Sequence, residues 1–185
     1  MRIVAGRFRS LPLASVGKGD RSAHLRPTAD RVRESLFSLL EHRGAVEGAA
    51  VLDLFAGTGA LGLEALSRGA RLATFVDDGR AAQRLIAENI SRLGVGQTAR
   101  ILRRDATRLG QGDGQAYDLV FLDPPYGKGL GERALSAARE GGWLAPDCLV
   151  VWEENSAMTP APGFERIDQR RYGDTHVTLL ITLPD

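Results

Sequence analysis

Short apolar runs alternate with amphipathic segments of helix length through most of this chain, and this alternation limits the folds it can adopt. The runs of strand length cover residues 50–55, 72–76, 100–103, 117–122 and 147–153. Helices are expected between them, over residues 60–68, 80–93 and 130–140. Alternating strands and helices form parallel sheets with right-handed crossovers. Two last runs, 164–167 and 176–181, are typical of an antiparallel pair. The sequence therefore predicts an α/β fold with a mostly parallel sheet.

The chain divides into a short basic start and one larger domain. Residues 1–25 predict a small hairpin followed by a polar loop, with Arg7 and Arg9 on its outer side. Residues 26–185 predict the main domain, which opens with a helix over 28–43. Thr28 is a suitable N-cap for that helix, since its hydroxyl can accept a bond from a free backbone amide. Helical spacing predicts a buried stripe that includes Leu36 and Leu40, with the arginines off it.

Charge is unevenly distributed along the 185 residues. Residues 1–33 hold eight Arg or Lys against two Asp, whereas the rest of the chain holds sixteen basic and twenty-one acidic residues. Arginine supplies seven of the eight early positive charges, and its planar guanidinium suits phosphate. This asymmetry favours a polyanionic partner such as nucleic acid over an ordinary solvated tail.

Composition excludes several other classes of protein. No apolar run is long enough to span a membrane, and the N-terminus lacks the apolar stretch of a secretory signal. The single cysteine, Cys148, allows no internal disulfide, and the three histidines show no metal-ligand spacing. We therefore expect a cytoplasmic, monomeric protein without a metal.

The four residues that follow the run 117–122 carry the clearest chemical signal. Asp123, Pro124, Pro125 and Tyr126 form a stiff loop, because neither a strand nor a helix continues through two prolines. The Asp123 carboxylate and the Pro124 carbonyl can both accept hydrogen bonds from an exocyclic amine. Tyr126 can stack on a flat heterocycle, as aromatic residues do with unstacked bases. A plain Pro-Pro turn with a solvated aspartate would show the same four residues.

A glycine turn follows the run 50–55 and indicates a nucleotide-like cofactor. Residues 57–62 match G-x-G-x-x-G, and Asp77 lies twenty residues past Gly57, where a ribose would be bound. Asp53, just before the turn, would repel a pyrophosphate but could accept a bond from an ammonium group. A cofactor with a ribose, an amino-acid end and no phosphate fits better than a dinucleotide, and S-adenosyl-L-methionine is such a cofactor. Asp105, after the third run, could accept from the adenine amino group.

Four motifs carry a resemblance to a known family. Residues 53–59 (DLFAGTG) with 123–126 (DPPY) resemble class I methyltransferases that act on exocyclic amines. Residues 25–37 (LRPTADRVRESLF) and 59–69 (GALGLEALSRG) narrow the resemblance to the bacterial 16S rRNA (guanine(966)-N(2))-methyltransferase family, the RsmD family. The resemblance implies a Rossmann-like class I methyltransferase fold: a mostly parallel seven-stranded sheet with an antiparallel C-terminal strand and a small N-terminal β-hairpin. It also implies methyl transfer to guanine N2 of 16S rRNA, on the rRNA or on an assembly intermediate of the small ribosomal subunit.

The resemblance assigns roles to particular positions. Catalysis falls to Asp123, Pro124, Pro125 and Tyr126. The cofactor-binding residues are Asp53, Ala56, Gly57, Thr58, Gly59, Asp77, Asp78, Asp105, Ala106 and Asp123. The RNA-binding residues are Arg7, Arg9, Arg26, Arg31 and Arg33. Asp77 stands where the family often has Glu, so its neighbour Asp78 is a second candidate for the ribose.

Other functions remain open at this point. A DNA adenine-N6 methyltransferase shares the loop at Asp123, although 185 residues leave little room for its usual target-recognition region. A non-catalytic RNA-binding protein could retain the fold, but the intact acids and glycines argue against it. A NAD-dependent dehydrogenase would need a proton-transfer His or Tyr that the sequence does not place.

Overall fold

The structure, a computed structural model, describes residues 1–15 and 30–184. Its helical elements are α1 (Asp30–His42), α2 (Ala60–Ser67), α3 (Arg80–Leu93), the 3-10 turn η1 (Ala106–Arg108) and α4 (Leu130–Glu140). Its strands are β1 (Ala50–Leu54), β2 (Leu72–Val76), β3 (Ala99–Leu102), β4 (Tyr117–Leu122), β5 (Leu144–Glu154), β6 (Phe164–Tyr172) and β7 (Thr175–Thr182).

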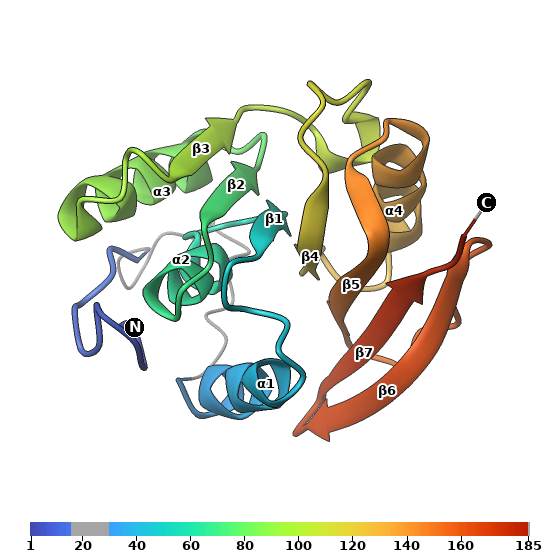
Figure 1. The fold of residues 1–185 in the computed structure, drawn as a ribbon, viewed down its shortest axis with the longest axis horizontal. Helices are drawn as coiled ribbons and strands as arrows, with labels where there is room; N and C mark the ends of the chain where they lie inside the picture. Colours follow the sequence, from blue (N-terminus) through green and yellow to red (C-terminus); the bar gives the residue numbers. More distant parts are fainter. Residues whose placement is uncertain (16–29, 185) are drawn as a thin grey trace.

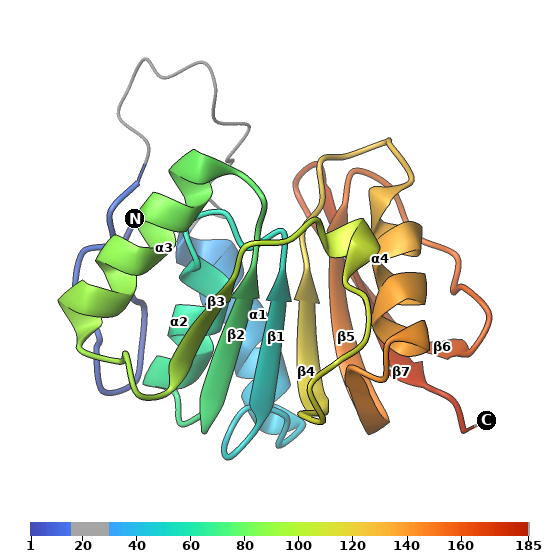
Figure 2. The same cartoon turned by 90° about the horizontal axis from the view of Figure 1, so that it is seen from above.

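All seven strands form one sheet in the order β3-β2-β1-β4-β5-β7-β6. The five strands from β3 to β5 are parallel, while β7 runs antiparallel to both β5 and β6. The predicted mostly parallel sheet with an antiparallel C-terminal strand is therefore confirmed. In Figure 2 the arrowheads of the parallel strands lie together along the side of the sheet where these strands end. This row of strand ends, which is distinct from the edge strands β3 and β6, is the carboxyl edge.

Helices cover both faces of the sheet (Figures 1 and 2). One apolar core joins α1, α2 and α3 to one face, and a second core joins α4 and η1 to the other. Close packing explains the glycine in the first turn of α4, since a Cβ at Gly131 would lie 2.4 Å from Trp152. Trp152 is fully buried, so its ring could not move aside at low cost.

The structure corrects several element boundaries. β5 begins at Leu144 rather than 147, and β6 continues to Tyr172 rather than 167. β6 is an exposed edge strand with alternating charges, so its outer half shows no apolar pattern from which to predict it. The buried face of α1 consists of Arg33, Leu36, Phe37 and Leu40. The expectation that its arginines lie off the buried stripe is therefore wrong for Arg33.

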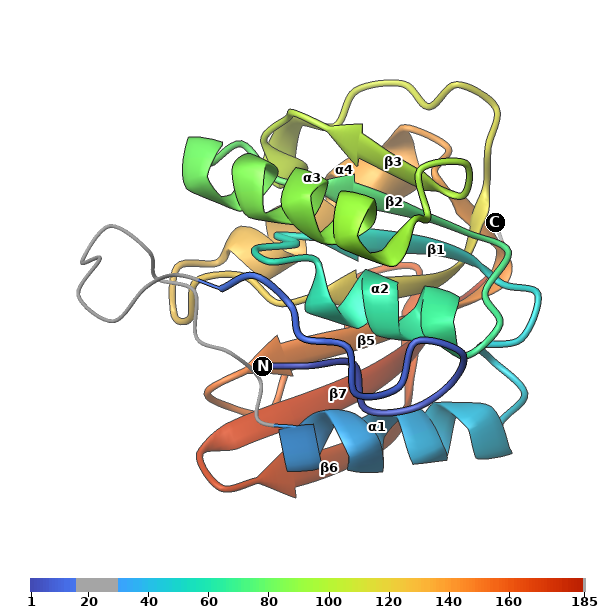
Figure 3. The same cartoon turned by 90° about the vertical axis from the view of Figure 1, so that its left-hand side faces the viewer.

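The first fifteen residues, here called the N-terminal arm, fold back on themselves and lie against the face that carries α2 (Figure 3). Arg2 and Pro12 form one antiparallel bridge, and the amide of Ile3 donates to the carbonyl of Leu11 at 3.0 Å. Ile3 and Leu13 are buried in the same core as α2. The arm is thus part of the packed structure, and the proposed N-cap Thr28 lies outside the described residues.

Candidate functional site

Three neighbouring strands end level with one another at the carboxyl edge. Leu54, the last residue of β1, pairs with Val76 of β2 on one side and with Leu122 of β4 on the other. Asp77 and Asp123 are the next residues along β2 and β4, so this register brings both to the same edge. Ligand sites of open α/β sheets lie at this edge. The expected gathering of acids is therefore a consequence of parallel register.

Asp53 lies within β1 and is 2% exposed. Its Oδ2 accepts a hydrogen bond from the amide of Gly62 at 3.0 Å, which satisfies a free amide in the first turn of α2. Burial raises the pKa of Asp53 to about 8; the Gly62 bond opposes this rise, and the nearby carboxylates of Asp77 and Glu153 add to it. A positive charge at this edge would favour the ionised form of Asp53.

The predicted glycine turn joins β1 to α2. Gly57 and Gly59 have φ angles of 59° and 77°, in the left-handed region that side chains disfavour. The amide of Gly59 donates to the carbonyl of Ala56 at 2.7 Å, which closes the turn. Gly62 is needed for packing, because a Cβ there would lie 2.4 Å from the ring of Phe75. The turn therefore lies close to the acids at the carboxyl edge.

Asp77 holds this turn in place from the neighbouring strand. Its Oδ2 accepts from the amide of Gly57 at 2.9 Å and its Oδ1 from the amide of Gly79 at 2.8 Å. Burial raises the pKa of Asp77; the two backbone bonds lower it, and Asp78 raises it further. Asp78 is exposed. Of the two candidates for a ribose contact, Asp77 is therefore the one whose carboxylate is fixed by backbone bonds.

Asp105 follows β3 and caps the turn η1. Its Oδ1 accepts from both the amide and the hydroxyl of Thr107, at 2.8 and 2.7 Å. The Thr107 hydroxyl bond is the main reason that the pKa of Asp105 is lowered. Ala106, the first residue of this turn, is buried. Asp105 is thus a fixed, ionised acceptor at the carboxyl edge of β3.

The predicted catalytic loop begins directly after β4. The amide of Asp123 lies 3.5 Å from the carbonyl of Leu54, which keeps the loop beside β1. Pro124 is buried and Pro125 is exposed. Burial is the main cause that raises the pKa of Asp123 well above its usual value, and the carboxylates nearby add to it. Deprotonated Asp123 is therefore a stronger base than an ordinary aspartate.

Tyr126 is half-buried, near enough to Asp123 to be affected by its charge. Its hydroxyl is hydrogen-bonded to the side chain of Thr175 in β7. Burial, followed by the charge of Asp123, raises the pKa of Tyr126 to about 12, so the hydroxyl stays neutral at pH 7. The bond to Thr175 fixes the ring orientation relative to the catalytic loop.

Two site acids were missed by the sequence analysis. Glu153 and Glu154 end β5 beside β4, and their charges contribute to the raised pKa of Asp123. Glu154 is buried, and its Oε1 accepts from the amides of Gly127 and Asn155, at 3.2 and 3.0 Å. Glu154 therefore holds the end of the predicted catalytic loop. Two acids at the carboxyl end of a buried apolar run were the signal that could have identified them.

The five candidate RNA-binding arginines differ in their exposure to solvent and in whether the structure describes them. Arg7 and Arg9 are exposed on the N-terminal arm, and Arg31 is exposed in the first turn of α1. Arg33 is fully buried, so its guanidinium has no surface to offer to RNA in this structure. Arg26 lies outside the described residues.

Neither a metal centre nor a membrane span is found in the described part of the chain. Residues 1–15 and 30–184 contain no group of three or more His, Cys, Asp or Glu that could hold a metal ion. Among the same residues, no helix combines the length and hydropathy needed to cross a bilayer.

Comparison with known proteins identifies relatives of this chain. A family described as conserved hypothetical protein 95 matches residues 1–181. The protein named ribosomal RNA small subunit methyltransferase D of Escherichia coli K12 is 39% identical over 155 residues, which are 83% of this chain and 74% of that protein. The family match therefore spans the site described above.

Solved structures agree with this relationship. The structure of yhhF from Escherichia coli superimposes with a TM-score of 0.82 and 34% identity, over 98% of this chain and 97% of that one. The structure of SMU.776 complexed with SAH gives a TM-score of 0.64 over 85% of this chain and 50% of that one. Its 17% identity shows a shared fold alone.

Proposed function

The chain belongs to the conserved hypothetical protein 95 family, which is the RsmD family of the sequence analysis, and on this premise we propose that it methylates ribosomal RNA. The reaction moves a methyl group from S-adenosyl-L-methionine to the exocyclic N2 of a guanine in 16S rRNA, of the position-966 type. The substrate is the rRNA of the small ribosomal subunit during its assembly.

One observation carries the proposal: carboxylates from adjacent strands gather at the carboxyl edge, where burial is the main cause that raises their pKa values. Asp53, Asp77 and Asp123 all have raised pKa values, and the charge of Glu153 contributes to two of them. Such a set disfavours a pyrophosphate and favours a ligand with positive groups. The residues present therefore fit S-adenosyl-L-methionine, which has an ammonium group and, when bound, supplies a methyl group made electrophilic by a positive sulfur.

The chain offers a partner for each part of that cofactor. The glycine turn, Ala56 to Gly59, offers backbone beside the amino-acid end, with the charge of Asp53 behind it. Asp77 uses each oxygen for one backbone amide, and a carboxylate has about four acceptor sites, so ribose hydroxyls can still be bound. Asp78 is the exposed alternative. Asp105, followed by the buried Ala106, accepts from the adenine amine.

Catalysis rests on orientation and on a base. The Asp123 carboxylate and the Pro124 carbonyl accept hydrogen bonds from the guanine amine and direct its lone pair, while Tyr126 stacks on the base. Orientation of this kind can supply about 7–11 kcal/mol. As the amine nitrogen gains the methyl group it loses one proton. The raised pKa of Asp123 suits it to accept that proton, after which solvent removes it.

Recognition of RNA falls to the exposed arginines. Arg7, Arg9 and Arg31 lie on surfaces that a phosphate backbone can reach, and Arg26 stays in the proposal from the resemblance alone. Arg33 is not among the proposed RNA-binding residues, because it is fully buried.

The deciding experiment is methyl transfer with a labelled methyl donor. Naked 16S rRNA and assembled small subunits, both from a strain lacking the activity, are incubated with the protein beside a duplex DNA containing adenine. We expect N2-methylguanosine in the RNA digest and no N6-methyladenine in the DNA. Labelled adenine in DNA, or no label in either form of rRNA, would contradict the proposal.

A further inference from the structure

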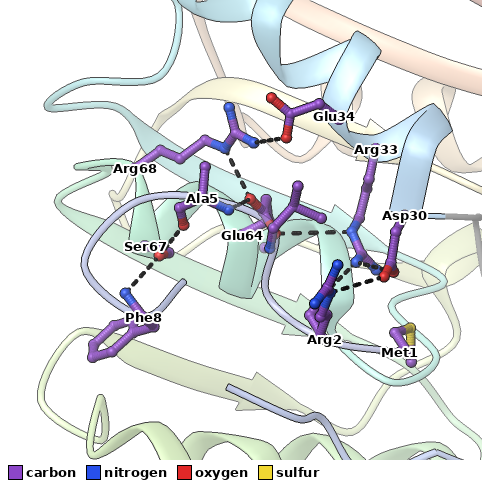
Figure 4. A network of polar contacts seen from close by, with 12 residues as sticks. Met1, Arg2, Ala5, Phe8, Asp30, Arg33, Glu34, Glu64, Ser67 and Arg68 are labelled. Carbon is purple, nitrogen blue, oxygen red and sulfur yellow. Dashed lines mark hydrogen bonds and ion pairs between the residues drawn. The ribbon is translucent and has the colours of Figure 1, made fainter. Parts of the chain in front are cut away.

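A buried carboxylate on α2 binds the backbone of the N-terminal arm. Glu64 is 0% exposed, and its two oxygens accept from consecutive amides of the arm, Val4 at 2.8 Å and Ala5 at 3.0 Å (Figure 4). Sixty residues separate Val4 from Glu64, so this contact is purely tertiary. Because both amides point at one carboxylate, the arm can bind there in only one register.

Two buried arginines neutralise this carboxylate. Arg68 Nε lies 2.9 Å from Glu64 Oε1, and Arg33 Nε lies 3.8 Å from Oε2. Arg33 also donates through Nη2 to the carbonyl of Arg2 in the arm and to Asp30 on α1. An unneutralised carboxylate would be expelled from such a position by its desolvation cost. This arrangement explains why Arg33 is buried, and it connects α1, α2 and the arm.

A second anchor lies one helical turn further along α2. The hydroxyl of Ser67 donates to the carbonyl of Ala5 at 2.6 Å and accepts from the amide of Phe8 at 3.0 Å. The carbonyl of Ser67 accepts from the amide of Arg7 at 2.9 Å. Gly6 allows this close approach, because a Cβ there would lie 1.9 Å from that carbonyl oxygen. The arm is therefore held to α2 at residues 4, 5, 7 and 8.

The exposed arginines of the arm are attached to this fixed backbone. Arg7 lies between Ala5 and Phe8, which are both bonded to the hydroxyl of Ser67. The amide of Arg9 donates to the carbonyl of Gly6 at 3.1 Å. Fixing the backbone before binding reduces the entropy lost when a charged side chain meets phosphate. We propose that Glu64 is a positioning residue for RNA: from inside the protein, it holds the arm so that Arg7 and Arg9 face the phosphate backbone. This inference rests on the proposed function.

Two variants test the inference. Glu64→Gln keeps the side-chain volume and removes the charge, and Ser67→Ala removes the hydroxyl that bonds the arm without touching the ion pairs. For each, we expect the KM for rRNA to rise about tenfold, with kcat and the KM for S-adenosyl-L-methionine changed less than about twofold. The slope of log affinity against log salt should flatten by about 0.7 for each phosphate that the arm no longer neutralises. Amide hydrogen exchange at residues 4 and 5 should accelerate.

The double variant Arg7→Ala/Arg9→Ala is the reference for these effects. Adding Ser67→Ala to it should cause little further loss, because a displaced arm matters only while it carries its arginines. Unchanged RNA affinity in Ser67→Ala with faster exchange at residues 4 and 5 would overturn the inference, whether or not Glu64→Gln folds. Failure of the proposed function differs from this result, since the wild-type protein would then transfer no methyl group to rRNA.

Discussion

The side chain of Asn89 on α3 bonds both backbone groups of Ala14 at the end of the N-terminal arm. The Ala14 amide donates to Asn89 Oδ1 at 2.6 Å, and Asn89 Nδ2 donates to the Ala14 carbonyl at 3.2 Å. The same Nδ2 donates to the carbonyl of Thr58 in the glycine turn at 2.9 Å. One fully buried amide therefore joins the arm to the proposed cofactor site.

Replacing Asn89 should destabilise the protein and loosen the glycine turn. Asn89→Ala leaves the nearly buried Ala14 amide without its acceptor, at a cost of about 1–3 kcal/mol in the free energy of unfolding. Urea denaturation measures this cost, and calorimetry with S-adenosylhomocysteine should show weaker binding. Glu88→Ala, an exposed change on the same helix, is the control and should cost less than about 0.5 kcal/mol. Equal behaviour of the two variants would show that Asn89 has no such role.

The raised pKa of Asp53 predicts how stability depends on pH. Its pKa is about 8 in the folded protein and ordinarily 3.8, so the folded state holds the proton more tightly. The stability that Asp53 contributes is complete below the lower value and is lost as the pH rises through about 8. Denaturation of the unliganded protein between pH 4 and pH 8 should show this decline. Asp53→Asn, which keeps an acceptor for Gly62, should reduce it; an unchanged pH profile would contradict the assignment.

Binding of a cationic ligand should release a proton from the same group. At pH 7 Asp53 is mostly protonated, and an ammonium group nearby favours its ionised form. Titration with S-adenosylhomocysteine in two buffers of different ionisation enthalpy measures the protons released. We expect up to about one proton in the wild-type protein and fewer in Asp53→Asn. If both proteins released the same number of protons, the ammonium group of the ligand would not lie near Asp53.

Two substitutions at Tyr126 should separate its ring from its hydroxyl. Stacking of a base on an aromatic ring contributes about 1–3 kcal/mol, so Tyr126→Ala should lower kcat/KM for rRNA by about 5- to 150-fold. Tyr126→Phe keeps the ring and loses the bond of the hydroxyl to Thr175, and it should retain most activity. Both variants should bind S-adenosylhomocysteine normally. A larger loss in Tyr126→Phe than in Tyr126→Ala would be inconsistent with stacking.

Asp123 should be required for turnover and not for folding. Asp123→Ala removes an acceptor for the guanine amine and the proposed base, so single-turnover methyl transfer should fall below detection. Its removal also lessens the repulsion felt by Asp53, which lies close enough for its charge to act on Asp123. The variant should therefore be at least as stable as the wild-type protein at pH 8, as measured by denaturation. Methyl transfer at a near wild-type rate would refute the role of Asp123.

A methyl group added at Gly62 should disturb the glycine turn by overpacking. Gly62→Ala places a Cβ 2.4 Å from Phe75 and 3.1 Å from Asp53 Oδ2, and such insertions cost about 1–3 kcal/mol. Gly96→Ala is the control, because no heavy atom lies within 4 Å of a Cβ there. Thermal denaturation should separate the two variants. Equal midpoints would mean that the Phe75 ring moves aside freely.

The sequence was most informative where local pattern and global fold agree. Apolar runs and glycine stops predicted β2, α3, β4 and α4 with their observed bounds, and the acids at strand ends followed from parallel order. The family resemblance, confirmed by relatives over most of the chain, rested on motifs at α1, in the turn from β1 into α2 and in the loop after β4. Boundaries were wrong at β5 and β6, where burial is one-sided or absent and no apolar periodicity marks the ends.

The sequence by itself determined the order of strands and helices, the parallel sheet and the row of acids at its carboxyl edge. These features depend on backbone geometry and on residues near in sequence. Only the tertiary structure decided that Arg33 is buried while Arg31 is exposed, and that Glu64 binds the N-terminal arm. A charged side chain enters the interior only when partners far along the chain neutralise and bond it. Because Glu64 lies 31 residues after Arg33, no local sequence pattern could have predicted their ion pair.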